Sequence, residues 1–118
     1  MGTTLSVYGI KNCDTMKKTF NLLEEEGIAY HFVDYKKTPP TQSLLESFLE
    51  KVPLDKLVNK RGTTYRKLSD DEKIKMDEEA TALPILVENS SMIKRPVMVY
   101  PDGEVVLGFQ KEIILDKK

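Results

Sequence analysis

The chain has 118 residues, 18 basic and 19 acidic side chains, a net charge of −1 and a single cysteine. This length fits one compact domain, because two separate cores would each be small. One cysteine excludes an intrachain disulfide and a cysteine-rich zinc site. The near-neutral charge argues against bulk binding to nucleic acid, and no apolar run approaches the length of a membrane span.

The first 35 residues have the pattern of a strand, a helix and a second strand. Residues 5–8 form a short β-rich run. Three apolar residues then recur at the spacing of one helix face: Met16, Phe20 and Leu23. Gly27 is expected to end this helix, and residues 29–35 are rich in aromatic and β-branched side chains. A strand, helix and strand in this order predict two parallel strands joined by a right-handed crossover.

The middle of the chain, from about residue 41 to 91, is expected to be a helical insertion. Four stretches have helical patterns: residues 44–52, 54–58, 69–79 and 81–89. Ser69 and Glu72 have the spacing of a capping box, which predicts a helix start. Pro84 is expected in the first turn of the last of these helices, where a proline is tolerated.

The C-terminal part returns to strands. Residues 97–100 and 104–107 flank Pro101-Asp102-Gly103, and an Asp-Gly pair between two β-rich runs is a strong signal for a hairpin. Residues 110–115 form either a closing helix or a tail. The order of the elements predicts an α/β protein with a mixed sheet that carries one antiparallel hairpin.

Cys13 is the first candidate functional residue, because it lies in the predicted turn between the first strand and the first helix. Free amide groups and the helix dipole favour an anion there, so a thiolate at this place should have a lowered pKa. A helix terminus supplies about 2 kcal/mol at most, and a strongly stabilised thiolate therefore needs a nearby cation as well. Asp14 and Thr15 are expected to provide the helix N-cap and a first-turn acid. The alternative for Cys13 is an inert, buried thiol.

Three segments resemble the signatures of the arsenate reductase-like family, in its small YffB-like branch. They are YGIKNCDTMKK at residues 8–18, NKRGTTYRKL at residues 59–68 and IKRPV at residues 93–97. Gly108-Phe109 resembles the segment that follows the family's hairpin. The segments occur in the family's order and together span most of the chain. The same family contains the Spx transcription regulators.

The resemblance implies a thioredoxin-like fold, with a mixed four-stranded sheet and a helical insertion in its middle. It also implies a cis peptide bond between Arg95 and Pro96, facing the cysteine loop. Arg95 would then be the cation that stabilises the Cys13 thiolate and takes part in catalysis with it. The residues expected to bind substrate are Lys11, Asn12, Arg61 and Pro96.

The resulting functional hypothesis is a cytoplasmic, monothiol reductase of disulfides or oxyanions, without a bound cofactor or metal. Met16 stands where a Cys-x-x-Cys pair would have its second cysteine. A resolving thiol must therefore come from elsewhere, and glutathione or a glutaredoxin is the expected partner. The hypothesis includes no direct contact with nucleic acid or with a membrane.

Two alternatives remain open at this point. One is an Spx-like redox regulator that docks on RNA polymerase, although such regulators commonly use the Cys-x-x-Cys switch that this chain lacks. The other is an arsenate reductase proper. Arsenate reductases carry a further arginine near the C-terminal end of the fold, whereas residues 107–111 of this chain read LGFQK.

Overall fold

The computed structural model describes residues 4–117, which form two compact units. The first unit contains the described residues up to Thr38 and those from Arg95 on, and the second unit is Pro39–Lys94. The second unit contains the whole region predicted as a helical insertion, residues 41–91. Each unit is described by itself below.

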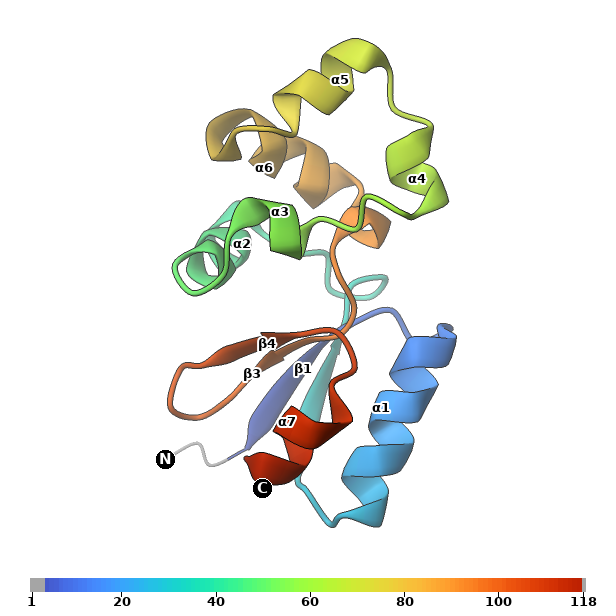
Figure 1. The fold of residues 1–118 in the computed structure, drawn as a ribbon, viewed down its shortest axis with the longest axis vertical. Coiled ribbons are helices and arrows are strands. Elements are labelled where there is room, and N and C mark those ends of the chain that lie inside the picture. The colour runs from blue at the N-terminus through green and yellow to red at the C-terminus, as the bar shows by residue number, and fades with distance from the viewer. Residues whose placement is uncertain (1–3, 118) are drawn as a thin grey trace. The chain divides into compact units, whose positions relative to one another are not determined.

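The first unit contains a four-stranded mixed sheet. Its elements in chain order are β1 (Leu5–Gly9), α1 (Asp14–Glu25), β2 (Tyr30–Asp34), β3 (Val97–Val99), β4 (Val105–Leu107) and α7 (Lys111–Asp116). The strand order is β2-β1-β3-β4, as Figure 1 shows. β1 and β2 are parallel, whereas β3 is antiparallel to both β1 and β4. This order and these directions are those of a thioredoxin-like fold, so the predicted fold class is confirmed.

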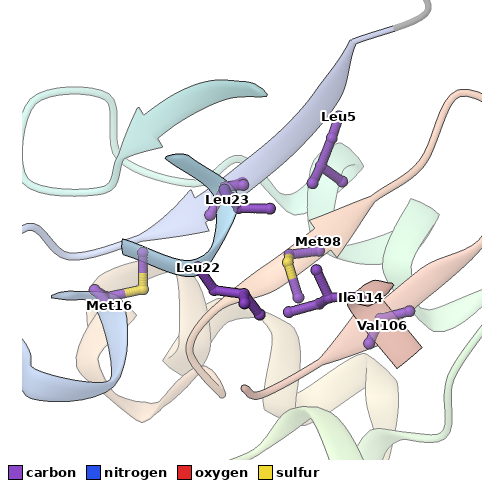
Figure 2. Packing of buried hydrophobic residues seen from close by; sticks show 8 residues of the cluster. Leu5, Met16, Leu22, Leu23, Met98, Val106 and Ile114 are labelled. Atoms are coloured by element: carbon purple, nitrogen blue, oxygen red, sulfur yellow. The ribbon is translucent and has the colours of Figure 1, made fainter. Parts of the chain in front are cut away.

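The core of the first unit lies between the sheet and the helices α1 and α7. Along β1, buried and half-buried residues alternate, as expected for a strand with one face on a core. The buried cluster, most of which is labelled in Figure 2, is formed by Leu5, Val7, Met16, Leu22, Leu23, Met98, Val106 and Ile114. Through this cluster, α1 packs against β1, the strand that precedes it in the chain.

The ends of the two helices in this unit follow the sequence pattern. Gly27 has φ +67°, and its N–H donates to the carbonyl of Glu24, so it ends α1 as predicted. Residues 110–115 had two possible interpretations, a helix or a tail. The structure has a helix there, α7, which begins at Lys111 after Gln110 as N-cap and ends at Asp116, one residue later than the predicted segment. Its Ile114 is fully buried, and burial of this side chain makes the helix part of the fold.

The predicted hairpin is present, and its loop consists of the three predicted residues, Pro101-Asp102-Gly103. The N–H of Gly103 donates to the carbonyl of Tyr100 at 2.8 Å, and the N–H of Tyr100 donates to the carbonyl of Glu104 at 2.9 Å. Gly103 has φ +91°, which places a glycine in the left-handed position of a three-residue hairpin loop. β3 ends at Val99 and β4 begins at Val105, so each strand is one residue shorter at the loop than predicted.

The second unit consists of short helices. They are α2 (Gln42–Leu49), α3 (Leu54–Leu57), α4 (Thr63–Arg66), α5 (Asp70–Lys75), α6 (Glu79–Glu88) and the 3-10 helix η1 (Ser90–Met92). Val58 and Ile93 form an isolated antiparallel bridge, and the N–H of Asn59 donates to the carbonyl of Met92 at 2.7 Å. This bridge joins the segment after α3 to the segment after η1.

Two helices in the second unit end earlier than predicted, and two short helices were not predicted. α2 ends at Leu49 and not at residue 52, because the N–H groups of Lys51 and Val52 both donate to the carbonyl of Phe48 and tighten the chain into a turn. The predicted capping box of Ser69 is present, but α5 ends at Lys75 and not at residue 79. The short helices α4 and η1 were not predicted, since their sequences TTYR and SSM lack two apolar residues at helical spacing. The equally short α3 has such a pair in Leu54 and Leu57.

Pro84 lies inside a helix and not in a first turn. α6 begins at Glu79, two residues earlier than predicted, which makes Pro84 its sixth residue. A proline there cannot donate to the carbonyl four residues earlier, so one helical hydrogen bond is lost. The neighbouring Leu83 and Leu86 are buried, and this packing holds the helix despite the missing bond.

Candidate active site

Cys13 is the N-cap residue of α1. Its backbone is extended, with φ −148° and ψ 132°, and its carbonyl accepts the N–H of Lys17 at 3.0 Å. The prediction that Asp14 or Thr15 caps the helix is therefore wrong: Asp14 is the first helical residue and supplies the acidic group of the first turn. A residue at the N-cap is beside the free amide groups of the helix, so its side chain is well placed to be an anion.

The electrostatic surroundings of the Cys13 thiol favour the thiolate. The side chain is half-buried, and burial by itself raises the pKa of the thiol. The backbone N–H groups of Met16 and Thr15 and the guanidinium of Arg95 act in the opposite direction and outweigh it, so the pKa of Cys13 is lowered below its ordinary value. The amide groups contribute more than Arg95 does. The predicted direction is confirmed, and the first turn of the helix is the larger source of it.

Gly9 positions the first turn of α1. A Cβ atom added to Gly9 would lie 2.7 Å from Sδ and 2.8 Å from Cε of Met16, closer than van der Waals contact allows. Met16 is fully buried, so its side chain has little room to withdraw. The absence of a side chain at Gly9 thus lets β1 and α1 approach closely, and it keeps the Met16 amide near Cys13. The sequence indicated Gly9 only as the end of the strand; a glycine between a strand and a helix can also signal such a close approach.

Strand pairing brings Arg95 to the cysteine loop. β3 runs antiparallel to β1, with Val97 opposite Tyr8, so the residues before Val97 lie next to those that follow Tyr8. The Arg95–Pro96 bond is cis, as the family resemblance predicted. Pro96 is buried, and its carbonyl accepts the N–H of Gly108 at 2.8 Å. These pairings place the Arg95 charge close enough to lower the pKa of Cys13.

The other predicted binding residues fall into two groups. Lys11 and Asn12 are exposed in the same loop as Cys13, where the N–H of Cys13 donates to the carbonyl of Lys11 at 3.1 Å. Arg61 belongs to the second unit, where it is exposed and its N–H donates to Oδ1 of Asn59 at 3.3 Å. The structure therefore groups Lys11 and Asn12 with the thiol, while the role of Arg61 in anion binding stays a prediction.

Within residues 4–117, no three histidine, cysteine, aspartate or glutamate side chains are grouped so that they could hold a metal ion. In that same part of the chain, every helix is too short or too polar to cross a membrane. A thiol with a lowered pKa beside a cation is suited to act as a nucleophile, and Cys13 and Arg95 form such an arrangement.

Comparisons with known proteins show which proteins this chain resembles. The model of the ArsC family matches residues 8–116. An uncharacterized protein of Haemophilus influenzae is 39% identical over 108 residues, which cover 92% of this chain and 93% of that protein. A protein of Rhizobium meliloti named arsenate reductase is 29% identical over 115 residues, 96% of this chain and 80% of that protein.

Two solved structures are similar over nearly the full length. The protein named YFFB has a TM-score of 0.89 and 36% identity, over 96% of this chain and 97% of that one. An arsenate reductase (ArsC) related protein from Brucella melitensis has a TM-score of 0.77 and 40% identity, over 98% of this chain and 95% of that one.

Proposed function

This chain belongs to the ArsC family, and on that premise we propose that it is a thiol-dependent reductase whose nucleophile is Cys13. The observation that carries the proposal is the place of its one cysteine. Cys13 stands at the N-cap position of α1, and the amides of the first turn and Arg95 lower the pKa of its thiol. A thiolate is the nucleophilic form of cysteine, and a lowered pKa also makes it a better leaving group from a mixed disulfide. Both properties suit a thiol that is attached to a substrate and then released.

We propose glutathione as the resolving thiol, because Cys13 has no second cysteine in the chain to resolve its adducts. In the first step the Cys13 thiolate attacks the glutathione sulfur of a mixed disulfide RS–SG. The S–S bond breaks, RSH leaves after taking a proton, and glutathione is bound to Cys13. A second glutathione thiolate then attacks that disulfide, which releases the Cys13 thiolate and oxidised glutathione. The sum is RSSG + GSH giving RSH + GSSG, a two-electron transfer.

The remaining site residues have electrostatic tasks in this proposal. Arg95 stabilises the thiolate both as nucleophile and as leaving group. Lys11 and Asn12 lie in the same loop and would bind the substrate near the reacting sulfur. Pro96 holds the chain at the start of β3, and Arg61 would add a charge for an anionic substrate.

Reduction of arsenate is a second candidate, favoured by the relatives named arsenate reductase. The Cys13 thiolate would attack arsenic(V) with loss of water, and glutathione would then attack the cysteine sulfur. Arsenite leaves with two electrons, and a second glutathione restores Cys13 and forms oxidised glutathione. The segment after β4, residues 107–111, offers no arginine for the oxyanion, so we expect this activity to be the weaker one.

The test compares the wild type with Cys13→Ser. Turnover of a glutathionylated peptide and of arsenate is followed by coupling oxidised glutathione to its reductase. We expect the turnover rate of the variant to be at least about 100-fold lower than that of the wild type on either substrate, because a serine hydroxyl is a weak nucleophile at neutral pH. The thiol pKa is measured in parallel from the rate of iodoacetamide alkylation against pH. A variant that keeps full activity, or a thiol pKa at the ordinary value, would contradict the proposal.

A further inference from the structure

A pocket beside the cysteine loop lies at the carboxyl ends of β1 and β2. These strands are parallel, with Gly9 opposite Asp34, and the N–H of Tyr35 donates to the carbonyl of Gly9 at 2.8 Å. The loops that follow the two strands therefore emerge side by side. Crevices at the carboxyl ends of strands in open α/β sheets are the places where such proteins bind ligands.

The turn after β2 is fixed by its own backbone. Oδ1 of Asp34 accepts the N–H of Lys36 at 3.0 Å. The carbonyl of Asp34 accepts the N–H of Lys37 at 3.0 Å and that of Thr38 at 2.8 Å. The carboxylate of Asp34 is thus engaged by the chain itself, and the turn presents Lys37 from a hydrogen-bonded base.

The pocket has a volume of about 410 Å³ and combines positive charge with apolar walls. It is lined by Lys11, His31, Phe32, Val33, Asp34, Lys37 and Thr38. Lys11 comes from the cysteine loop and Lys37 from the turn after β2. The lining thus includes two lysines and one carboxylate, that of Asp34. Across residues 4–117, neither of these two lysines has an ion pair with an acidic side chain. Two unpaired ammonium groups in one pocket are complementary to an anion.

We propose that this pocket binds a carboxylate of the peptidyl thiol whose sulfur reacts at Cys13, and that Lys37 is a binding residue for it. This inference rests on the proposed function. Lys11 lies two residues from Cys13, and a tripeptide can span about 10 Å, so one molecule can reach from the sulfur to the pocket. Phe32 and Val33 provide apolar surface for the backbone and methylene groups of such a peptide.

The experiment follows the formation of the mixed disulfide at Cys13, with two oxidants that differ in charge. Reduced protein is mixed with oxidised glutathione, which carries carboxylates, or with 2-hydroxyethyl disulfide, which is neutral. The variants are Lys37→Gln and, as matched control, Lys36→Gln. Lys36 lies in the same turn and has the same charge, but it does not line the pocket.

We expect Lys37→Gln to slow the reaction with oxidised glutathione about fivefold and to leave the reaction with the neutral disulfide unchanged. The factor is modest because the lysine is exposed to solvent. Lys36→Gln should change neither rate. The bound group is then identified with oxidised glutathione whose glycyl carboxylates or γ-glutamyl α-carboxylates are esterified. When the carboxylate that Lys37 binds is blocked, Lys37→Gln should no longer slow the reaction.

Two results would overturn the inference. Lys37→Gln and Lys36→Gln could slow oxidised glutathione equally, which would indicate a general effect of charge and no pocket. Lys37→Gln could also leave oxidised glutathione unaffected, while Cys13 of the wild type reacts rapidly with both disulfides; the proposed function would then stand without the pocket. A wild-type thiol that reacts with neither disulfide would instead contradict the proposed function, and this inference with it.

Discussion

The two compact units of this chain place their functional residues by different means. In the first unit, Cys13 and Arg95 follow and precede paired strands, and backbone hydrogen bonds of the sheet determine where they lie. In the second unit, Arg61 lies in the segment between the short helices α3 and α4, where its N–H donates to the side chain of Asn59. The first unit therefore holds a cysteine whose fixed surroundings lower its pKa. The second unit holds Arg61 in a segment between two short helices.

A cavity made by mutation in the core of either unit tests whether the pKa of Cys13 depends on the packing of that unit. Leu23 in α1 and Leu86 in α6 are fully buried, so Leu23→Ala and Leu86→Ala should each lower the free energy of unfolding by about 2–5 kcal/mol. Leu86→Ala should leave the pKa of Cys13 unchanged, because Met16, Thr15 and Arg95 all lie in the first unit. Urea unfolding and the pH profile of alkylation measure the two effects. A changed thiol pKa in Leu86→Ala would mean that the units are coupled at the site.

Removal of the cation tests the preorganised thiolate directly. Arg95→Ala should raise the pKa of Cys13 and slow alkylation at pH 7 by about two- to tenfold, because the amides of the first turn remain. Arg61→Ala is the matched control, and we expect it to leave the alkylation rate unchanged. If both variants slowed alkylation alike, the thiolate would depend on the charges of both units, and the contrast between them would disappear.

The helix cap of α5 offers a smaller perturbation confined to the second unit. Oγ of Ser69 accepts the N–H of Glu72, and Oε1 of Glu72 accepts the N–H of Ser69. Ser69→Ala should cost about 1 kcal/mol of stability, as loss of an N-cap usually does. Thermal unfolding checks the cost, and alkylation of Cys13 should be unaffected. Ser69→Asp is the control, since aspartate also caps helices and should keep most of the stability.

The smallest expected effect is the dependence of stability on the ionisation of Cys13. Its pKa is lower in the folded protein than in the unfolded chain, so folding stabilises the thiolate. This contribution is complete above the pKa of the unfolded thiol and is lost as the pH falls through the lowered pKa of the folded protein. The difference in Tm between the wild type and Cys13→Ser should therefore favour the wild type more at about pH 9.5 than at about pH 6. A difference that does not change with pH would show that the thiolate is not stabilised by folding.

The sequence alone determined the features that depend on neighbours along the chain. Periodicity and turn signals predicted the first strand, α1, the second strand and the hairpin, because side chains one or a few residues apart share a face or a turn. The family resemblance added the cis bond before Pro96 and the pairing of Arg95 with Cys13. Local patterns failed where an element is very short, as in α4, or where packing overrides propensity, as at Pro84 in α6.

Which residues lie close together in space depends on the tertiary structure. The approach of Gly9 to Met16, the place of Cys13 as N-cap and the pocket shared by Lys11 and Lys37 do not follow from spacing in the chain. The pocket follows from the register of β1 with β2, since pairing of strands brings residues far apart in sequence to the same end of the sheet. The approach of Gly9 to Met16 follows from the packing of α1 on β1 in the core. The sequence identified the thiol, and the fold surrounds it with the amides of the first turn of α1 and the guanidinium of Arg95, which together lower its pKa.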